Sequence, residues 1–239
     1  MKRNALNIAV IPARGGSKRI PRKNIRPFCG VPMIVHSIQV ALNSGLFVHV
    51  VVSTDDQEIA DVALRYGALV PFRRPDHLAD DHATTLDVMA HAVHSCETLG
   101  WAAQRYCCLY ATAPFVTEPD LRRGLEAVSK PGVSYAFSAT RFEFPVQRAV
   151  KISDDGSIAP AWPEFIAARS QDLEPMFHDA GQFYWGQAAA FASKASFFAA
   201  HSRAIILPGY RVQDIDDEED WHRAELMHAA WQAEIQRLA

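Results

Sequence analysis

The residues best suited to chemistry gather in one segment near the amino terminus, Ile11–Asn24. This segment reads IPARGGSKRIPRKN and follows a short apolar run that ends at Pro12. The paired Gly15 and Gly16 let the backbone approach a ligand closely and turn its N–H groups toward it. The cations of the segment are Arg14, Lys18, Arg19, Arg22 and Lys23. A triphosphate carries roughly three to four negative charges, and such a loop supplies both hydrogen-bond donors and compensating charge.

We interpret this segment as an anion-binding loop, because a strand, paired glycines and cations occur together. A solvated run of charges is the alternative interpretation. The segment has neither the GxxxxGK[ST] spacing of a P-loop nor the GxGxxG spacing of a dinucleotide fingerprint. The missing glycine spacing disfavours an oxidoreductase built on a Rossmann sheet.

A second group of candidate residues lies near the carboxyl terminus. Asp214 and Asp216 are two positions apart on a predicted extended stretch, so both carboxylates should point to the same side. Mg²⁺ takes oxygen ligands, keeps several waters and commonly bridges carboxylates to substrate phosphates. We therefore expect a Mg²⁺ site here, which Mn²⁺ could also fill. The alternative is an acidic helix start, which accounts for residues 217–220.

Composition and charge exclude several classes of function. The chain has 239 residues, of which 49% are hydrophobic, enough for one well-filled core. Its 24 basic and 27 acidic residues provide no general field for nucleic acid or an anionic membrane. No stretch approaches the roughly 20 apolar residues of a membrane-spanning helix. The four cysteines form no CxxC motif, so we expect reduced thiols and a cytoplasmic enzyme.

Short β-rich runs alternate with amphipathic helices, which predicts an α/β fold with a mostly parallel central sheet. The expected strands cover residues 6–11, 49–52, 69–72, 106–110, 133–140 and 183–191. The expected helices cover residues 32–45, 56–67, 84–99, 118–129 and 218–238. The glycine-containing loop then follows the first strand, at the edge where open α/β sheets bind ligands.

The segment 141–179 differs in character from its surroundings. It is richer in proline, arginine and aromatic residues and has weak helical periodicity. We interpret it as an arm inserted into a single domain that spans residues 1–239, and not as a second domain. Its aromatic side chains could form a dimer contact: Phe142, Phe144, Phe165 and Phe177.

Taken in order, the motifs resemble the N-acylneuraminate cytidylyltransferase family over nearly the whole chain. That family begins with a strand followed by a pattern like IPARGGSKxxPxKN. Val52–Asp55 is similar to its STD motif, and Arg74–Asp81 contains its RP and LA.D elements. Thr112–Pro114 occupies the place of its PTSP-like turn, and Asp214–Asp216 resembles its metal-binding IDID element.

Two segments carry a finer resemblance, to the pseudaminic acid cytidylyltransferases within the family. They are Arg169–Leu173 and His178–Gly186. Neuraminate and legionaminate enzymes usually have a RPNGAIY-like string where the second segment stands. The departure falls on the acceptor side of the site, where differences in substrate are expected.

The resemblance implies a Rossmann-like nucleotidyltransferase fold with an inserted dimerisation arm. It also implies that the anomeric hydroxyl of a nonulosonic acid attacks the α-phosphorus of CTP, giving a CMP-sugar and pyrophosphate with the help of Mg²⁺. Pseudaminic acid is the expected acceptor; N-acetylneuraminate, legionaminate and KDO are the alternatives with the same chemistry. A non-catalytic nucleotide-binding protein is the alternative from a different class. The implied assembly is a homodimer with an exchanged arm, without nucleic acid or membrane partners.

The resemblance also assigns roles to individual residues. The expected nucleotide contacts are Ala13, Arg14, Gly15, Gly16, Ser17, Lys18, Lys23, Arg74, Asp81 and Thr84. The expected catalytic residues are Arg14 near the α-phosphate, Lys23 opposite the leaving pyrophosphate, and Asp216. The expected metal ligands are Asp214 and Asp216, and the expected sugar contacts are Arg169, Gln171, His178, Gln182 and Tyr184.

Several of these assignments leave alternatives open. Arg19 and Arg22 could equally well only solvate the loop. Asp81 could equally cap the helix that follows it. A lone histidine beside an aspartate, as at His178, is more often structural than a general base.

Overall fold

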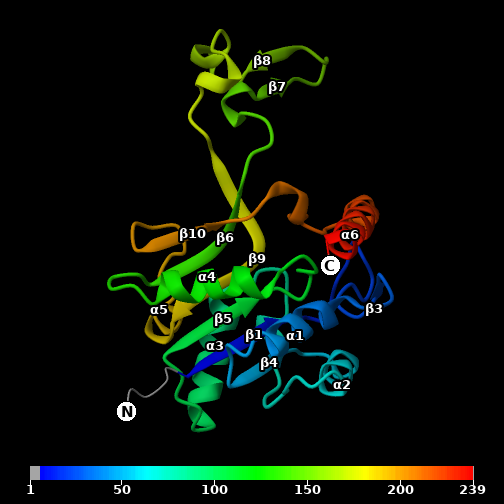
Figure 1. Cartoon of the computed structure of the whole chain (residues 1–239), viewed down its shortest axis with the longest axis vertical. Helices are drawn as coiled ribbons and strands as arrows, with labels where there is room; N and C mark the ends of the chain where they lie inside the picture. Colours follow the sequence, from blue (N-terminus) through cyan, green and yellow to red (C-terminus); the bar gives the residue numbers. More distant parts are fainter. Residues whose placement is uncertain (1–5, 239) are drawn as a thin grey trace.

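In the computed structural model, which describes residues 6–238, a six-stranded sheet forms the centre of the molecule (Figure 1). The strand order is β10-β6-β9-β5-β1-β4. The strands are β1 (Asn7–Pro12), β4 (His49–Ser53), β5 (Arg105–Leu109), β6 (Tyr135–Arg141), β9 (Phe177–Gln187) and β10 (Ser202–Ile206). β9 pairs antiparallel with both of its neighbours, whereas the other pairs are parallel. The prediction of an α/β fold with a mostly parallel central sheet is confirmed.

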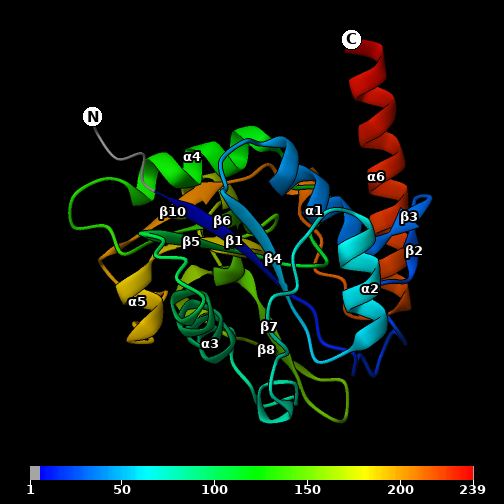
Figure 2. The same cartoon turned by 90° about the horizontal axis from the view of Figure 1, so that it is seen from below.

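Helices cover both faces of this sheet (Figure 2). One face carries α1 (Met33–Asn43), α2 (Gln57–Arg65) and α4 (Glu118–Val128), and the other carries α3 (Thr85–Thr98) and α5 (Ala188–Ala192). Ala9 and Ile11 of β1 belong to the core cluster that includes α1, whereas Ile8 and Val10 belong to the cluster that includes α3. Because successive side chains of a strand point to opposite faces, a strand covered on both sides is apolar throughout. This explains the continuous apolar run that leads into the glycine loop.

The helices α2 and α3 begin at side-chain caps. Asp56 accepts a hydrogen bond from Ile59 N at 3.0 Å before α2. Thr84 and Asp87 form a reciprocal capping box at the start of α3. Such caps satisfy N–H groups that have no partner within the helix. The last helix, α6 (Glu218–Leu238), extends away from the sheet (Figure 2).

Two expected strands differ from the observed ones. Residues 69–72 make a single isolated bridge, between Leu69 and Val51, because Pro71 has no N–H to donate to a ladder. The strand expected at residues 183–191 begins earlier, at Phe177, and ends at Gln187, where the alanine-rich α5 starts. Alanine favours the helix most strongly of all residues, so its run ends the strand. The edge strand β10 and the small hairpin of β2 (Pro27–Phe28) and β3 (Val31–Pro32) were not predicted.

Between β6 and β9 the chain leaves the sheet as an arm, residues 142–176 (Figure 1). The two strands stay paired to the base of the arm, where Arg141 lies opposite Phe177. The outer part of the arm holds a hairpin of β7 (Val150–Ile152) and β8 (Ile158–Pro160). Within residues 142–176, Leu173 is the one buried side chain. An arm with so little buried surface has no core of its own.

Candidate active site

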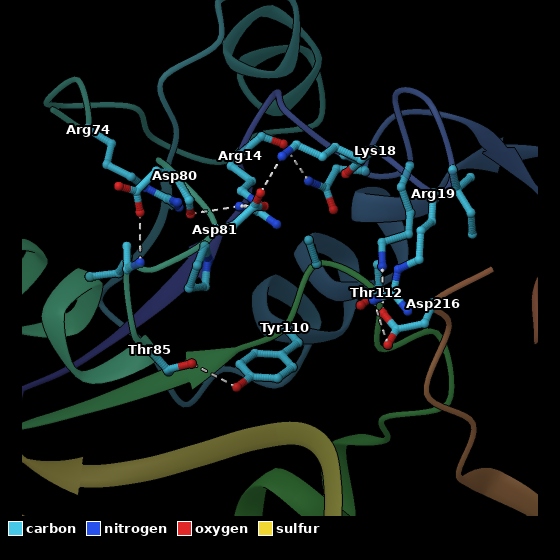
Figure 3. Close-up of a pocket in the computed structure, with 18 of the residues that line it drawn as sticks. Arg14, Lys18, Arg19, Arg74, Asp80, Asp81, Thr85, Tyr110, Thr112 and Asp216 are labelled. Atoms are coloured by element: carbon cyan, nitrogen blue, oxygen red, sulfur yellow. Dashed lines mark hydrogen bonds and ion pairs between the residues drawn. The ribbon is translucent and has the colours of Figure 1, made fainter. Parts of the chain in front are cut away.

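A cavity of about 580 Å³ opens where β1 and β5 end. These strands are parallel neighbours, with Val10 paired to Cys108, so their carboxyl ends meet at the same edge of the sheet. The segment that follows β1 is the glycine loop, and the segment that follows β5 supplies Tyr110 and Thr112. The further lining residues shown in Figure 3 include Arg14, Lys18, Arg19, Arg74, Asp80, Asp81, Thr85 and Asp216.

The glycine loop is fastened to the end of the neighbouring strand β4. Ala13 N donates to Ser53 O at 3.0 Å, and Gly15 N donates to Asp55 Oδ1 at 3.1 Å. A Cβ atom on Gly15 would lie 2.7 Å from Asp56 Oδ2, so this position has no room for a side chain. Gly16 has no atom within 4 Å of a Cβ position and is free of that constraint. The loop conformation therefore depends on close backbone approach at Gly15.

Two carboxylates on the cavity wall pair with the cations of the loop. Asp81 lies 2.8 Å from Arg14 and 2.5 Å from Lys18, and these two cations lower the pKa of the Asp81 carboxyl. Asp216 lies 2.9 Å from Arg19 and 3.6 Å from Lys23. The loop thus holds four cations around one cavity, which suits a polyphosphate. The helix cap that Asp81 could have formed is made by Thr84 instead.

The structure separates the two arginines that the sequence left open. Arg19 lines the cavity, whereas the Arg22 side chain forms ion pairs with Asp56 at 2.6 Å and Glu58 at 2.5 Å. Arg22 also has a positive φ of 57°, which turns the chain between the phosphate-facing part of the loop and Lys23. The printed sequence contains no signal that tells these two arginines apart, because their partners come from distant segments.

Arg74 is a buried cation in the cavity wall. Only 3% of the residue is exposed, and its Nε donates to Ser53 Oγ at 3.2 Å while another guanidinium nitrogen donates to Ser53 O. Burial lowers the pKa of Arg74 to about 10. Within residues 6–238 this guanidinium forms no ion pair, so it has positive charge available for a polar group of a ligand.

Sequence reasoning missed two hydroxyl groups at the cavity. Thr85 Oγ1 and Tyr110 OH lie 2.9 Å apart, and burial raises the pKa of Tyr110. The expected nucleotide contact Thr84 does not line the cavity, because its hydroxyl bonds to Asp87 in the helix cap at 2.6 Å. The Thr84-Thr85-Leu86-Asp87 spacing could have revealed this cap, since a capping box joins the first and fourth of its residues.

The two expected metal ligands lie on an unpaired stretch before α6. Asp216 lines the cavity and Asp214 does not, so the expected common orientation is only partly realised. Partial burial and the nearby charge of Asp216 raise the pKa of Asp214. A cation held between them would relieve this repulsion, so the donor pair fits a hard divalent ion that draws its other ligands from water and substrate. The described part of the chain has no cluster of three or more potential metal ligands.

The acidic residues after this pair serve the helix. Asp217 Oδ1 accepts hydrogen bonds from the N–H groups of Glu219 and Asp220, both at 3.0 Å. Asp220 in turn accepts the N–H of Asp216 at 3.1 Å. The acidic helix start therefore accounts for these later residues and also helps to fix the backbone of Asp216.

The expected sugar contacts do not reach the cavity within one protomer. Arg169 and Gln171 lie in the arm, where Arg169 pairs with Asp172 at 2.7 Å. His178 lies at the base of the arm, with its Nδ1 2.8 Å from Asp179 O. These residues are exposed on the arm and do not line the cavity.

The other two expected sugar contacts are interior residues, which corrects their assignment for one protomer. Gln182 is 2% exposed and its Nε2 donates to Arg211 O at 2.5 Å. Tyr184 is 3% exposed, donates its hydroxyl to Asp179 and packs against Phe137. Both lie on β9, a central strand with helices on each side, so side chains on either face of it are buried.

An open α/β sheet with a basic glycine loop at the end of its first strand, whose cations pair with Asp81 and Asp216 around one cavity, is the architecture of an enzyme class that transfers nucleotidyl groups. The family model described as cytidylyltransferase matches residues 8–216. The chain therefore belongs to the cytidylyltransferase family, and it is a CTP-dependent nucleotidyltransferase.

Curated relatives agree with this family. The chain is 42% identical to the pseudaminic acid cytidylyltransferase of Campylobacter jejuni over 222 residues, which cover 93% of this chain and 96% of that protein. It is 32% identical to the CMP-N,N'-diacetyllegionaminic acid synthase of Legionella pneumophila over 225 residues, 91% of this chain and 94% of that protein. The predicted resemblance to CMP-nonulosonate cytidylyltransferases is confirmed.

The solved structure of CMP:2-keto-3-deoxy-manno-octonic acid synthetase complexed with CTP has the same fold. Its TM-score is 0.70 at 18% identity, and the match covers 95% of this chain and 99% of that one. The predicted nucleotidyltransferase fold is confirmed by this likeness. Among the helices of residues 6–238, none combines the length and apolar character needed to cross a bilayer.

Proposed function

We propose that the protein transfers CMP from CTP to the anomeric hydroxyl of a nonulosonic acid, with pseudaminic acid as the acceptor, and releases pyrophosphate. The observation that carries this proposal is that Lys23 and Asp216 form an ion pair at 3.6 Å on the wall of the cavity that the cations of the glycine loop line. The acceptor is proposed from the relatives whose names include pseudaminic acid, which match nearly the whole chain.

In this mechanism the protein positions the reactants and stabilises charge, and it forms no covalent intermediate. The side chains of Arg14, Ser17 and Lys18, which line the cavity, bind the triphosphate. Lys23 is the donor opposite the leaving pyrophosphate. It is held in place because its Nζ donates to Ile215 O at 2.5 Å and its side chain is only 19% exposed. A donor fixed in advance loses little free energy to reorganisation when charge develops.

Mg²⁺ or Mn²⁺, held by Asp214 and Asp216, would offset the charge of the phosphates when bound. Asp216 also has a role in the free enzyme, before CTP binds. Asp216 holds Arg19 and Lys23 at the cavity until the triphosphate competes for them. Arg74 is proposed to contact the cytidine part of CTP, because it is a buried cation on the cavity wall that forms no ion pair within residues 6–238.

We also propose a homodimer in which the arm of one protomer covers the cavity of the other. The arm exposes large apolar side chains, with Phe144 78% exposed, Ile152 72% and Ile158 69%. Exposed apolar surface on this scale is typical of an interaction site. An exchanged arm would bring Arg169 and Gln171 to the sugar carboxylate and acyl groups of the partner's substrate. Arginine suits a carboxylate because its guanidinium binds both oxygens.

On this proposal residues 1–239 form one cytidylyltransferase domain with an arm at about 141–179, because the arm lacks a core of its own. A cytoplasmic location is proposed from the cysteines, all four of which are free thiols. Free thiols are typical of a reducing compartment.

The test is to incubate the protein with CTP, Mg²⁺ and a panel of pseudaminic, N-acetylneuraminic, legionaminic and KDO acids. Products are identified by mass and pyrophosphate release is measured. We expect CMP-pseudaminic acid as the fastest product, and a faster reaction with another acid would contradict the acceptor. CTP binding without pyrophosphate from any acid would instead favour a non-catalytic nucleotide-binding protein.

Matched variants of the loop test the assignment of residues. Lys23→Met should lower kcat/KM by about 100-fold or more, the effect of removing one preorganised donor. Arg22→Met removes a charge from the same loop, but its partners Asp56 and Glu58 lie outside the cavity, so kcat/KM should stay near the wild-type value. Equal losses in both variants would show that the loop acts only through its total charge.

A further inference from the structure

A buried ion pair outside the cavity joins two segments that belong to the site. Asp120 lies in the first turn of α4, and Arg211 lies in the turn that follows β10. Arg211 Nη1 donates to Asp120 Oδ2 at 2.5 Å, and Nη2 donates to Oδ1 at 3.2 Å. The side chain of Asp120 is 3% exposed and that of Arg211 is 11% exposed. Such a pair holds its two segments firmly together, because breaking it leaves a buried charge with fewer partners.

Arg211 also makes contacts that lead directly to the cavity. Its Nη1 donates to Phe115 O at 3.3 Å, in the loop that begins with Thr112 of the cavity wall. Its carbonyl oxygen accepts a hydrogen bond from the buried Gln182 on β9 at 2.5 Å. Arg211 is thus attached to α4, to the β5–α4 loop and to the central sheet at once.

The segment after Arg211 carries the proposed metal ligands and has little support of its own. Residues 212–216 pair with no strand of the described chain. At the far end the segment is fixed at Ile215, which is fully buried and accepts the hydrogen bond from Lys23. The backbone around Asp214 is therefore anchored at Arg211 on one side and at Ile215 on the other, and Asp216 is held in addition by Asp220, whose carboxylate accepts the Asp216 N–H at 3.1 Å.

We propose that Arg211, held by Asp120, is a positioning residue for the carboxylates of Asp214 and Asp216. This inference rests on the proposed function of those two residues. The two carboxylates repel each other, and the backbone that carries them gains no support from a strand, so a clamp at Arg211 opposes their separation. Groups that orient the ligands of a metal without touching it commonly change metal affinity by about 10- to 100-fold when they are removed.

Asp120 is suited to act as a fixed base for this clamp. It also accepts hydrogen bonds from Thr117 Oγ1 at 2.6 Å and from Arg123 at 2.8 Å. Burial alone would raise the pKa of Asp120, but the hydrogen bonds from Arg211, Thr117 and Arg123 outweigh it and keep the pKa below its usual value. If Arg211 is removed, Arg123 still compensates the carboxylate, so the fold can survive the substitution.

Arg123 also supplies the matched control. It binds the same carboxylate, but its side chain is 47% exposed and its other partner is Ile206 O at the edge strand β10. Arg123→Met therefore removes an ion pair with Asp120 without touching the segment that carries Asp214 and Asp216.

The experiment compares Arg211→Met, Arg211→Lys and Arg123→Met with the wild-type full chain. Mn²⁺ binding is measured by electron paramagnetic resonance without CTP, the Mg²⁺ midpoint is measured in the pyrophosphate assay, and thermal unfolding reports stability. Arg211→Met should weaken Mn²⁺ binding and raise the Mg²⁺ midpoint by about tenfold. Arg123→Met should leave both near wild type. Arg211→Lys should shift both by less than Arg211→Met, because an ammonium cannot make all the contacts of the guanidinium.

Wild-type metal binding in Arg211→Met, or an equal shift in Arg123→Met, would overturn the inference. If Arg211→Met fails to fold, Arg211→Lys carries the test, and an unchanged Mg²⁺ midpoint in that variant counts against a positioning role. A wild-type enzyme that neither binds nor needs a divalent metal would overturn the proposed function, and this inference with it. If the wild-type enzyme needs the metal, but Arg211→Met and Arg123→Met have the same Mg²⁺ midpoint, this inference alone is overturned.

Discussion

Gly15→Ala tests whether close backbone approach, and not only charge, builds the anion-binding loop. The new methyl carbon would lie 2.7 Å from Asp56 Oδ2, 2.9 Å from Asp56 Cβ and 3.1 Å from Asp56 Cγ. Asp56 is not free to retreat, because it binds Arg22 at 2.6 and 2.9 Å and caps α2 through Ile59 N at 3.0 Å. Overpacking of this kind costs about 1–3 kcal/mol, and loss of a cap adds about 1 kcal/mol.

We therefore expect Gly15→Ala to lower the free energy of unfolding by roughly 2–4 kcal/mol, measured by urea denaturation. Gly16→Ala is the matched control, since its methyl group meets no atom within 4 Å and should change stability by less than about 1 kcal/mol. In an Asp56→Ala background the methyl carbon loses its contacts with Oδ2 and Cγ, so the cost of Gly15→Ala should fall. Equal stability of Gly15→Ala and Gly16→Ala would refute the packing argument.

Three further predictions concern stability and pH. Gly124→Ala should destabilise the fold by about 2 kcal/mol or more in the same denaturation assay, because its methyl would collide with Trp185 Cδ1 and lie 3.0 Å from Phe183 Cε2; a neutral effect would show that the Trp185 ring can move. Asp214→Asn should abolish turnover and yet raise Tm at pH 7. The pKa of the Asp214 carboxyl is raised in the fold, so its ionisation destabilises the fold as pH rises through that pKa, and an amide avoids this loss. A lower Tm of the variant would contradict this reasoning. Burial lowers the pKa of both His36 and His228, whose rings lie 5.3 Å apart, so the packing of α6 should weaken as pH falls from about 6.5 through the lowered values. His228→Phe should flatten the dependence of Tm on pH, and an unchanged slope would exclude this pair as the cause.

The elements that sequence reasoning predicted well are those with strong local signals. The strand before Pro12 and the helix that Thr84 caps follow from apolar periodicity and from side chains a few residues apart. The elements that were missed depend on distant partners. β10 has an exposed edge and gains its place only by pairing with β6, and the end of β9 is decided by where the alanine-rich α5 begins to pack.

The candidate site divides in the same way. The expected nucleotide contacts from Arg14 to Lys23 are contiguous, so a common role is visible in one segment, and Arg14, Ser17, Lys18 and Lys23 line the cavity. Thr85 and Tyr110 were missed because they come from an α-helix and a strand end that meet only in the fold. Gln182 and Tyr184 were assigned to the sugar because a motif shows the residue type and not the face of the strand on which it lies.

By itself the sequence determined that this protein has a basic glycine loop after its first strand, an α/β fold and membership in a family of cytidylyltransferases. Residue type and local spacing are enough for the loop and the fold class, because these depend on interactions between near neighbours in the chain. The family followed from the resemblance of motifs spread over nearly the whole chain. Only the tertiary structure decided which cations face the cavity, that Asp81 and Asp216 hold them there, and that Arg211 fastens the segment of the carboxylates to Asp120. Charges act through space, so their partners are known only when the chain has brought distant residues within a few ångströms.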